Sequence, residues 1–321
     1  MNADSEKKQN PGVDRPFVSV VVPAYNSPLR SAECIEALLE QTYPKNKYEI
    51  IVIDNGSTDN TPKVIKQYPV VFLAENTIKS PYAARNKGIT HSRGEIIAMI
   101  DVNCLPVSNW IEEGVKTIES ETADLVGGQV KFKFSDARTA SELYDSVTNV
   151  QIERNIRERN VSKGGNLFVR RAVFDAIGLF PLSRSGGDVS WTRRATRSGL
   201  KLVYSPKALA TYPARTLLPL IKKQYRVGRG QPFIWRDEGL GYAGLLLRKL
   251  VLFLPLLPSV LRKIIDERGT EEIKRLYNYQ QSPGRNNRLI VKLWLASYLC
   301  NLATGIGAFI SMPGVIFRKT K

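Results

Sequence analysis

The stretch FVSVVV, Phe17–Val22, is a run of apolar and mostly β-branched residues that ends at Pro23. A continuous apolar run of this length is typical of a strand that is buried on both faces of a parallel sheet. Three more runs follow along the chain, at Ile50–Ile53, Val70–Leu73 and Glu95–Ile100. The four runs therefore predict neighbouring strands of one buried sheet.

The segments between these runs have the features of short helices. Apolar residues recur at helical spacing in Leu29–Gln41, and Thr61–Gln67 has a proline in its first turn. Pro81–Thr90 and Trp110–Glu119 are interpreted as two further helices. Strands that alternate with short helices predict an α/β fold with a doubly wound, mostly parallel and Rossmann-like sheet.

Each predicted strand is followed by a loop of small polar residues. The four loops are Ala24–Ser27, Asp54–Asp59, Glu75–Ser80 and Asp101–Asn103. In doubly wound sheets ligands bind beyond the carboxyl ends of the strands, where such loops converge. A single acidic residue there, such as Asp59, is also explained as the cap of the next helix. Four polar loops at one edge nevertheless predict a ligand site.

The charge of the 321-residue chain is divided unevenly. Residues 1–130 contain 13 Lys and Arg against 17 Asp and Glu, a net charge of −4, whereas residues 131–321 contain 34 against 13, a net charge of +21. This asymmetry favours an ordinary α/β half joined to a half that faces an anionic partner. Substrate phosphates, an acidic membrane surface and a nucleic acid are the three alternatives, although a nucleic-acid binder is more often basic throughout.

The cysteines and the N-terminus predict a protein of a reducing compartment. Cys34, Cys104 and Cys300 are too few and too far apart for a disulfide framework or a cysteine-based zinc site. Residues 1–16 form a polar tail without the apolar core of a secretory signal. The one histidine, His91, is interpreted as a surface or structural residue.

The composition changes after about residue 235. Leu250–Leu261 is apolar but too short to cross a bilayer, whereas Leu293–Phe317 has 25 residues without a formal charge and basic residues on both sides. Residues 236–321 are therefore predicted to form a helical, membrane-associated region that lies in the interface or re-enters it. The alternative is that both segments pack onto the preceding domain or into a dimer.

Six motifs, in this order and spacing, resemble those of family 2 glycosyltransferases. They are PAYN (Pro23–Asn26), DNGSTDNT (Asp54–Thr61), ARNKG (Ala84–Gly88), Asp101-Val102-Asn103, GGNLFVRRAVFDAIGLF (Gly164–Phe180) and GGDVSWTRR (Gly186–Arg194). The resemblance covers about residues 17–230 and implies the GT-A fold, a nucleotide-diphosphate sugar as donor and inversion at the sugar. It divides the chain into a tail at 1–16, a GT-A domain at 17–235 and the C-terminal region at 236–321. Within the domain, 17–105 would be the nucleotide-binding half and 106–235 the acceptor half.

The resemblance places the nucleotide at the edge formed by the strand ends. The Asp54 carboxylate can accept hydrogen bonds from a uracil edge, and the Tyr25 ring can stack on the base. Arg85 offers a planar fork of donors to the phosphates, with a solvated surface arginine as the alternative. The full set of implied nucleotide-binding residues is Pro23, Ala24, Tyr25, Asn26, Asp54, Asn55, Arg85 and Asp101.

Asp101 and Asn103 stand where the family usually has Asp-x-Asp, which holds a divalent cation on the donor phosphates. The resemblance implies Mn²⁺ or Mg²⁺ on these two residues, because hard oxygen ligands suit both ions. Two departures predict a weakened metal site. Asn103 lacks the charge of an aspartate, and Tyr212 stands near the position where many relatives have a histidine ligand. Arginines are expected to replace part of the charge of the metal.

Asp188 is predicted to be the general base that deprotonates the acceptor hydroxyl, because an inverting transfer needs one carboxylate on that side of the sugar. The implied acceptor-binding residues are Gly165, Asn166 and Trp191, with a core tryptophan as the alternative for Trp191. Arg226 and Arg229 lie in a basic segment that follows the core of many relatives. They are predicted either to close over the diphosphate or to touch lipid phosphates.

These residues predict an inverting transferase that moves a sugar from a nucleotide-diphosphate sugar, with uridine as the expected nucleoside, to a saccharide or lipid-linked acceptor in cell-surface polysaccharide or glycolipid synthesis. The predicted place is the cytoplasmic face of a bacterial plasma membrane, as a peripheral or monotopic protein on anionic lipid, with no nucleic acid as partner and with homo-oligomerisation left open. One alternative is a catalytically degenerate nucleotide-sugar-binding protein, suggested by Asn103, Tyr212 and Gly187. Another is a nucleic-acid binder, which rests on the basic half alone.

Overall fold

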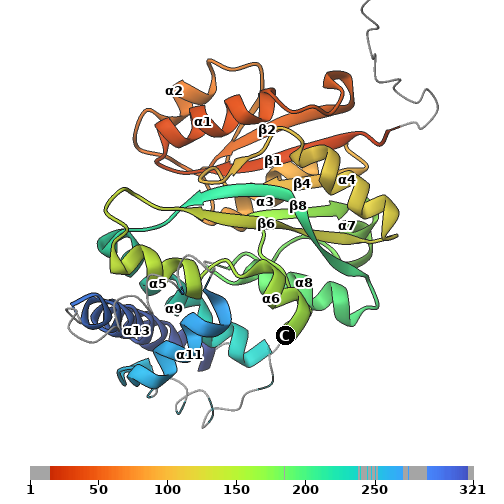
Figure 1. Cartoon of the computed structure of the whole chain (residues 1–321). Helices are drawn as coiled ribbons and strands as arrows, with labels where there is room; N and C mark the ends of the chain where they lie inside the picture. The colour runs from red at the N-terminus through yellow and green to blue at the C-terminus, as the bar shows by residue number, and fades with distance from the viewer. Residues whose placement is uncertain are drawn as a thin grey trace, which may run out of the picture.

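The computed structural model of the chain describes residues 15–183, 185–237, 252–269 and 288–316, together with the single residues 239, 244, 247, 250 and 274. In the last segment, side chains are described for 291–312. Most of the predicted tail at 1–16 lies outside these residues, and so do large parts of the region 236–321. Figure 1 shows one sheet with helices on both faces and a group of C-terminal helices to one side.

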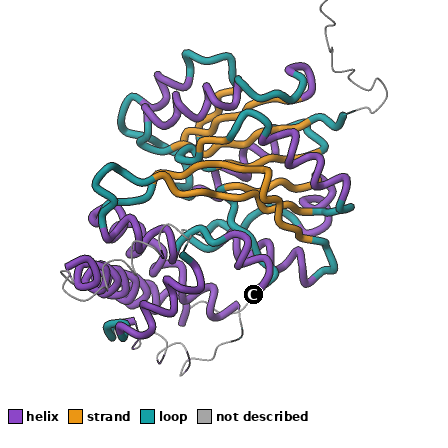
Figure 2. The backbone as a smooth tube through the Cα atoms, viewed as in Figure 1, coloured by secondary structure: helices purple, strands orange, loops and turns teal. Residues whose placement is uncertain are grey.

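Eight strands form one sheet in the order β3-β2-β1-β4-β7-β6-β8-β5 (Figure 2). The first half is parallel: β1 (Val18–Ala24) pairs with β2 (Tyr48–Asp54) and β4 (Ile96–Ile100), and β3 (Val71–Ala74) pairs with β2. All seven residues of β1 are buried, as the apolar run predicts. The four predicted strands are therefore confirmed, each within two residues at either end.

The second half of the sheet mixes directions. β7 (Asn166–Arg170) runs antiparallel to both β4 and β6 (Leu125–Lys133), β8 (Leu202–Pro213) runs parallel to β6, and the short β5 (Leu105–Pro106) is antiparallel to β8 at the edge. The predicted α/β fold with a mostly parallel sheet is confirmed. The reversal at β7 matters for the site, because it pairs the first residue of β7 with the last residue of β4.

Helices cover both faces of the sheet. One face carries α1 (Pro28–Leu39) and α4 (Trp110–Ser120), and the other carries α3 (Pro81–His91), α7 (Arg171–Ile177) and α8 (Gly187–Arg197). Each face has its own core cluster, and β1 contributes to both because successive side chains of a strand point to opposite faces. The remaining short helices of this part are η1 (Lys45–Lys47), α2 (Thr61–Ile65), α5 (Ala140–Thr148) and α6 (Ile152–Arg159). The four helices predicted between the strands are all present.

The C-terminal helices α9 (Leu217–Asp237), α11 (Pro258–Arg268) and α13 (Arg288–Ile316) lie on one side of the sheet (Figure 1). α13 packs along α9 and against α5, and apolar side chains of α5, α9, α11 and α13 form a third cluster. α9 and α13 cross closely, since a Cβ on Gly228 would collide with the carbonyl oxygen of Thr304. α13 is thus packed tightly against α9.

α13 contains a stretch that is long and apolar enough to cross a membrane. This stretch, Val291–Met312, has 22 residues and a mean hydropathy of 1.5, and 44% of its apolar window is buried within the protein. The exposed apolar side chains of α13 are Val291, Leu295, Leu299, Ile306, Phe309 and Ile310. One face of α13 therefore packs on α9 and α5, and another is exposed and apolar. Length and composition of one such helix are weak evidence for membrane association.

The cysteines and the histidine have the roles that the sequence predicts. Cys34, Cys104 and Cys300 are buried free thiols. His91 is exposed at the end of α3, and its Nδ1 atom lies 2.8 Å from the carbonyl oxygen of Lys87. Neither residue type takes part in the site described below.

Candidate active site

The carboxyl ends of β1, β2 and β4 meet at one edge of the sheet, and predicted nucleotide-binding residues lie at each of them. Tyr25 follows β1, Asp54 ends β2 and Asp101 follows β4. Because β7 runs the other way, the segment before it, Gly164-Gly165, reaches the same edge. The backbone N–H of Asp101 donates to the carbonyl oxygen of Gly165 at 3.2 Å. The sheet therefore joins the two halves of the chain at Asp101.

Asp54 and Tyr25 leave polar and aromatic groups available to a ligand. Asp54 is 3% exposed, and its Oδ2 accepts hydrogen bonds from two backbone N–H groups of the following turn, at 3.2 and 3.0 Å. Its Oδ1 is buried and has no hydrogen-bond partner among the described residues. Tyr25, which follows the β1 residue that pairs with Asp54, is 50% exposed. Pro23 and Ala24 are buried within β1. An unsatisfied acceptor and an exposed ring are what a nucleobase requires.

Asn26 and Asn55 hold the loops around this edge. Asn26 Oδ1 accepts from the backbone N–H of Thr58 at 2.8 Å, which ties the β1 loop to the β2 loop. Asn55 Nδ2 donates to the carbonyl oxygens of Glu75 and Ile78, at 3.2 and 2.9 Å, and ties the β2 loop to the segment after β3. Both side chains are bonded within the protein, so they position the loops around this edge of the sheet.

Arg85 lies in the middle of the site. It is 4% exposed, and its Nη2 forms an ion pair with Oδ1 of Asp101, whose side chain is 43% exposed. Its Nε has no hydrogen-bond partner among the described residues, and its Cζ lies 5.5 Å from the ring centroid of Tyr82. The alternative of a solvated surface arginine is therefore wrong. A buried guanidinium with an unused donor is suited to a phosphate oxygen.

Asp188 lies in the first turn of α8, with both carboxylate oxygens held in place. Oδ1 accepts from the hydroxyl of Tyr82 at 3.0 Å, and Oδ2 accepts from the backbone N–H of Gly164 at 2.9 Å. Burial acts to raise the pKa of Asp188, but Lys163, the Gly164 N–H, Arg85 and the Tyr82 hydroxyl outweigh it and lower that pKa. The carboxylate is therefore ionised at neutral pH.

Two glycines let these charged groups converge. A Cβ on Gly165 would lie 2.8 Å from Oδ2 of Asp101. A Cβ on Gly164 would lie 3.4 Å from both Cζ of Arg85 and Cβ of Asp188. At Gly165 a larger residue would push against the Asp101 carboxylate, whereas at Gly164 a Cβ would make an ordinary van der Waals contact. The structure thus brings Asp101, Arg85 and Asp188 together around one pair of glycines.

Two of the predicted acceptor-binding side chains are core residues. Trp191 is 1% exposed, stacks on Phe174 with ring centroids 4.9 Å apart, and donates its indole N–H to the carbonyl oxygen of Gly178 at 2.7 Å. Asn166 is fully buried, accepts from the indole N–H of Trp110 at 2.9 Å, and donates to two backbone carbonyls. Both side chains are buried, so neither can contact an acceptor. The core alternative therefore holds for Trp191, and the predicted acceptor contact of the Asn166 side chain is wrong.

Sequence reasoning missed Tyr82, Lys163 and Gly164. The double glycine of the GGNLF motif was an available signal for Gly164, and Lys163 is its neighbour. Tyr82 lies two residues before the ARNKG motif, and its hydroxyl reaches a carboxylate 106 residues further along the chain. Only the packing of α3 against α8 reveals that contact.

Arg226 and Arg229 lie on α9. Arg226 is exposed, and Arg229 is partly buried with an Nε atom that has no hydrogen-bond partner among the described residues. α9 lies against the loop before α8, because a Cβ on Gly230 would meet the carbonyl oxygen of Ser185. The position of α9 next to this loop is compatible with both alternatives for the two arginines, which stay predictions.

The residues predicted to hold a divalent cation do not fit one well. One oxygen of Asp101 is already paired with Arg85, and Asn103 offers only a neutral amide. Tyr212, at the position near the histidine of relatives, is 5% exposed and lies under the guanidinium of Arg215, with Cζ 4.5 Å from the ring centroid. Within the described part of the chain, no group of three His, Cys, Asp or Glu side chains could hold a metal. One shared carboxylate and one amide make a poor ligand set for Mn²⁺ or Mg²⁺.

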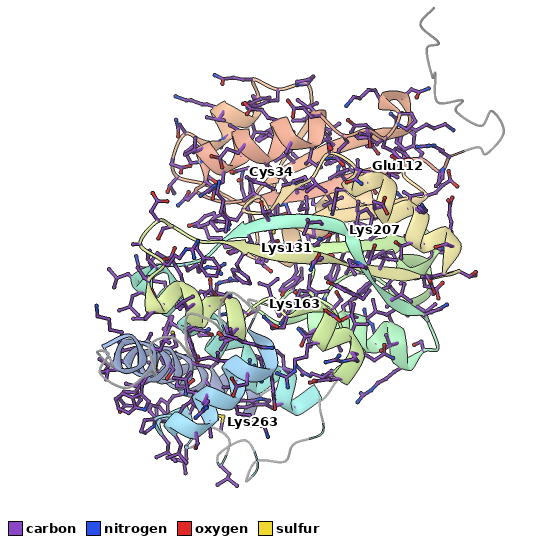
Figure 3. The ribbon with its side chains drawn as sticks, viewed as in Figure 1. Cys34, Glu112, Lys131, Lys163, Lys207 and Lys263 are labelled. Atoms are coloured by element: carbon purple, nitrogen blue, oxygen red, sulfur yellow. The ribbon has the colours of Figure 1, made fainter. Side chains whose placement is uncertain are left out.

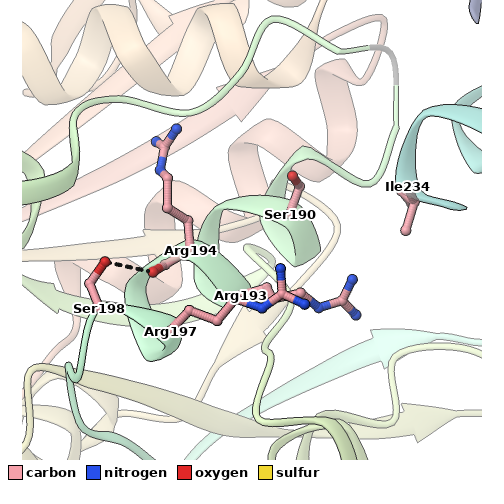
Figure 4. A pocket seen from close by; sticks show the side chains of 6 residues that line it. All are labelled: Ser190, Arg193, Arg194, Arg197, Ser198 and Ile234. Carbon is pink, nitrogen blue, oxygen red and sulfur yellow. Dashed lines mark hydrogen bonds between the residues drawn. The ribbon is translucent and has the colours of Figure 1, made fainter. Parts of the chain in front are cut away.

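A hollow lies between α8 and α9 (Figure 4). It has a volume of about 240 Å³ and is lined by Ser190, Arg193, Arg194, Arg197, Ser198 and Ile234. Figure 4 shows the side chains of α8 on one side and Ile234 of α9 on the other. Three arginines in one hollow are in line with the strong positive charge of residues 131–321.

Comparison with known proteins identifies the family. Glycosyltransferase AglE of Haloferax volcanii is 40% identical to this chain over 301 residues, which are 91% of this chain and 95% of that protein. The chain belongs to glycosyl transferase family 2. The sequence model of the family described as "Glycosyl transferase family 2" matches residues 19–178. As a family 2 member the chain is a glycosyltransferase, which transfers a sugar from a nucleotide sugar.

A second protein and a solved structure are also similar to this family 2 member. A protein of Methanococcus voltae is 23% identical over 235 residues, which are 65% of this chain and 70% of that protein; it is named dolichyl N-acetyl-alpha-D-glucosaminyl phosphate 3-beta-D-2,3-diacetamido-2,3-dideoxy-beta-D-glucuronosyltransferase. The solved structure of mannosyltransferase PcManGT from Pyrobaculum calidifontis, in complex with GDP-Man and Mn²⁺, shares the fold with a TM-score of 0.62 and 18% identity, over 92% of this chain and 87% of that chain. The expected bacterial origin is not supported, because Haloferax volcanii is an archaeon.

Proposed function

We propose that this glycosyltransferase inverts the sugar as it transfers it from a uridine diphosphate sugar to a hydroxyl of a lipid-linked saccharide. The observation that supports this most is the ionised Asp188 carboxylate, held by Tyr82 and Gly164 beside the Arg85–Asp101 pair. The donor and acceptor halves of the chain meet at this one place. A carboxylate fixed there can take a proton while the donor diphosphate leaves on the other side.

The donor end of the site binds the nucleotide through the residues of the strand ends. The base stacks on the exposed ring of Tyr25, and its N–H edge donates to the unused Oδ1 of Asp54. The Nε of Arg85, which has no partner among the described residues, donates to the phosphates, and this charge-assisted hydrogen bond is strong because the guanidinium is buried. The same geometry also admits a guanosine nucleotide, and the experiment below distinguishes the two.

The transfer itself needs one base and one leaving group. The acceptor hydroxyl oxygen forms a bond to the anomeric carbon, the bond from that carbon to the diphosphate oxygen breaks, and the hydroxyl proton passes to Asp188. Because the pKa of Asp188 is lowered, the proton moves as the new bond forms and the hydroxyl becomes acidic. No step is assigned to a metal ion, since Asp101 and Asn103 do not fit one well; the predicted use of Mn²⁺ or Mg²⁺ stays a prediction.

The C-terminal helices support a membrane-bound acceptor. α13 has an exposed apolar face, and α11 presents the exposed cations Arg262 and Lys263, which pair along the helix with Asp266 and Glu267 at 3.9 and 3.8 Å. Lys263 is labelled in Figure 3. Apolar side chains next to cations suit the surface of an anionic leaflet. The relative from Methanococcus voltae is named for a dolichyl-linked phosphate acceptor. We therefore place the enzyme on the cytoplasmic face of the plasma membrane as a peripheral or monotopic protein, and homo-oligomerisation stays a prediction.

Replacing Asp188 with asparagine tests the proposal. Asp188→Asn should lower kcat for transfer from a uridine diphosphate sugar to lipid extract by about 10²- to 10⁴-fold, because it removes the base and keeps the shape. The affinity for uridine diphosphate, measured by calorimetry, should stay within about threefold of the wild type. Asp175→Asn, at an exposed carboxylate of α7, is the matched control and should leave both values unchanged. Full turnover by Asp188→Asn would exclude Asp188 as the base.

A further inference from the structure

A buried carboxylate joins three elements beside the site. Asp145 of α5 is fully buried. Its Oδ2 lies 3.2 Å from Nη1 of Arg215 and accepts the backbone N–H of the same residue at 3.0 Å. Its Oδ1 lies 3.5 Å from Nζ of Lys223 on α9. One carboxylate thus faces two cations whose side chains are only 20% and 13% exposed.

The charges of this joint extend into the active site. The Arg215 guanidinium is close enough to Asp101 and to Arg226 to interact electrostatically with both. Lys163 acts on both Lys223 and the base Asp188. Figure 3 shows Lys163 between the sheet and the C-terminal helices. The joint and the site therefore form one continuous group of charges.

This group has an excess of positive charge. Its cations are Arg85, Lys163, Arg215, Lys223 and Arg226, and its carboxylates are Asp101, Asp145 and Asp188. With five cations against three carboxylates, the group carries an excess of positive charge. Arg215 and Lys223 are mostly buried and share the single carboxylate of Asp145, and because a buried charge without a counter-ion is costly, this pair favours an anion nearby.

The excess of positive charge affects the pKa of Lys223. Burial and the neighbouring Arg215 lower the pKa of Lys223 to about 7, Asp145 acts to raise it, and Lys163 lowers it further. The groups that face Lys223 are Asp145 from α5, Arg215 after β8, Lys163 before β7, and the thiol of Cys300 from α13. An anion next to these groups would stabilise the charged form of Lys223.

We propose that Lys163, Arg215, Lys223 and Arg226 form an anion site that receives the diphosphate of the donor and supplies the positive charge that other family members take from a divalent cation. The inference rests on the proposed function, since it names how the same site holds its leaving group. The proposal explains both departures from the family pattern. Asn103 weakens the metal site, and the ring of Tyr212 supports the guanidinium of Arg215. When the sugar–diphosphate bond breaks, the added charge falls on oxygens beside fixed cations.

Calorimetry on the full chain tests the site, with uridine diphosphate and guanosine diphosphate as probes. The nucleotide that binds should do so in EDTA with an affinity within about threefold of that in Mn²⁺. Lys223→Met should weaken this binding about tenfold or more, because it removes one charge-assisted contact. Lys222→Met, which removes the same charge from the neighbouring exposed residue, is the matched control and should change the affinity less than about twofold.

Proton uptake on nucleotide binding is a second measurement, because a purely structural role of Lys223 would not change it. At about pH 8 much of Lys223 is neutral, because its pKa is about 7, and a bound diphosphate raises that pKa. Binding heats in two buffers of different ionisation enthalpy should therefore show uptake of a fraction of a proton by the wild type. Lys223→Met should abolish this uptake, and Lys222→Met should retain it.

The remaining outcomes separate this proposal from the proposed function. If Lys223→Met fails to fold because Asp145 loses its partner, then Arg226→Met, at an exposed position, and the double variant Asp145→Asn with Lys223→Met replace it, with the same expected loss. Binding that requires Mn²⁺, is lost in EDTA and is unaffected by these variants would overturn the anion site and leave the proposed function intact. Absence of binding by both nucleotides, with and without Mn²⁺, would overturn both.

Discussion

The donor end and the acceptor end of the site are built in different ways. At the donor end, Asp54 ends β2 and Tyr25 follows β1, and because these two strands are paired and parallel, the sheet itself sets their places. At the acceptor end, Asp188 is held by the Tyr82 hydroxyl and the Gly164 N–H, which lie 106 and 24 residues away in the chain. A change at the donor end should therefore affect nucleotide affinity alone. A change at the acceptor end should disturb several charged groups together.

The largest effect is expected where the two ends meet. In Gly165→Ala the new methyl group would lie 2.8 Å from Oδ2 of Asp101, so Asp101 and its ion pair with Arg85 must move. Since a displacement of about 1 Å in a site can cost about 10²-fold, kcat/KM for transfer should fall by about 100-fold. The fall should come with a normal circular dichroism spectrum, which checks that the sheet is intact. Wild-type kcat/KM in this variant would show that the glycine is not needed for the site.

An intermediate effect is expected at the donor end. Asp54→Asn places an amide where the base needs an acceptor, and a hydrogen bond to a charged group contributes about 1.5–3 kcal/mol. The affinity for uridine and for uridine diphosphate should therefore fall about 10- to 100-fold, whereas saturating donor should restore kcat. Asp59→Asn, whose carboxylate accepts from Thr61 in the same loop, is the control and should retain the affinity. Equal losses in both variants would mean that only the loop conformation matters.

The smallest effect concerns the bond that holds the base. Tyr82→Phe removes a hydrogen bond that helps to lower the pKa of Asp188, so that pKa should rise. Asp188 must be ionised to act, and activity is lost as pH falls through its pKa. The acid limb of kcat/KM should therefore move to higher pH by less than about one unit, with roughly a fivefold loss of kcat.

A tyrosine far from the site controls for the loss of a hydroxyl group. The hydroxyl of Tyr48 donates to the carbonyl oxygen of Leu38 at 3.0 Å, within the core cluster under α1. Tyr48→Phe should leave the acid limb in place. An acid limb that stays in place in Tyr82→Phe as well, or that moves to lower pH, would contradict the role given to Tyr82.

The donor end could be predicted from the sequence almost completely. β1 is buried on both faces, and a strand in that environment is apolar at nearly every position, so FVSVVV is recognisable without knowledge of its neighbours. Its one polar residue, Ser19, is hydrogen-bonded to Glu49 and to the backbone N–H of Gly94. Asp54 and Asp101 lie at strand ends, and the direction of a parallel strand alone places them at the ligand edge. Arg85 was predicted from its motif, but the sequence did not predict that its side chain is buried.

The acceptor end could be predicted only in part. Asp188 was found through its motif, yet Trp191, one turn later on the same helix, was predicted to bind the acceptor with a core position as the alternative, and it stacks on Phe174 in the core. Asn166 has the polarity of a binding residue but satisfies the indole N–H of Trp110 inside the sheet. The sequence shows only the type of a polar or aromatic side chain. It does not show whether that side chain contacts a ligand or another buried group.

The sequence by itself determined the strands and helices of the parallel half, the polar edge where they end, and the excess of positive charge in the second half. Local patterns suffice for these features, because burial on both faces and helical spacing act on neighbouring residues. Only the tertiary structure decided that β7 runs against β4 and brings Gly164-Gly165 to Asp101, and that Asp145 of α5 gathers Arg215 and Lys223 from two other segments. The physical reason is that hydrogen bonds and ion pairs act over a few ångströms, so contacts between residues distant in the chain exist only after whole elements have packed.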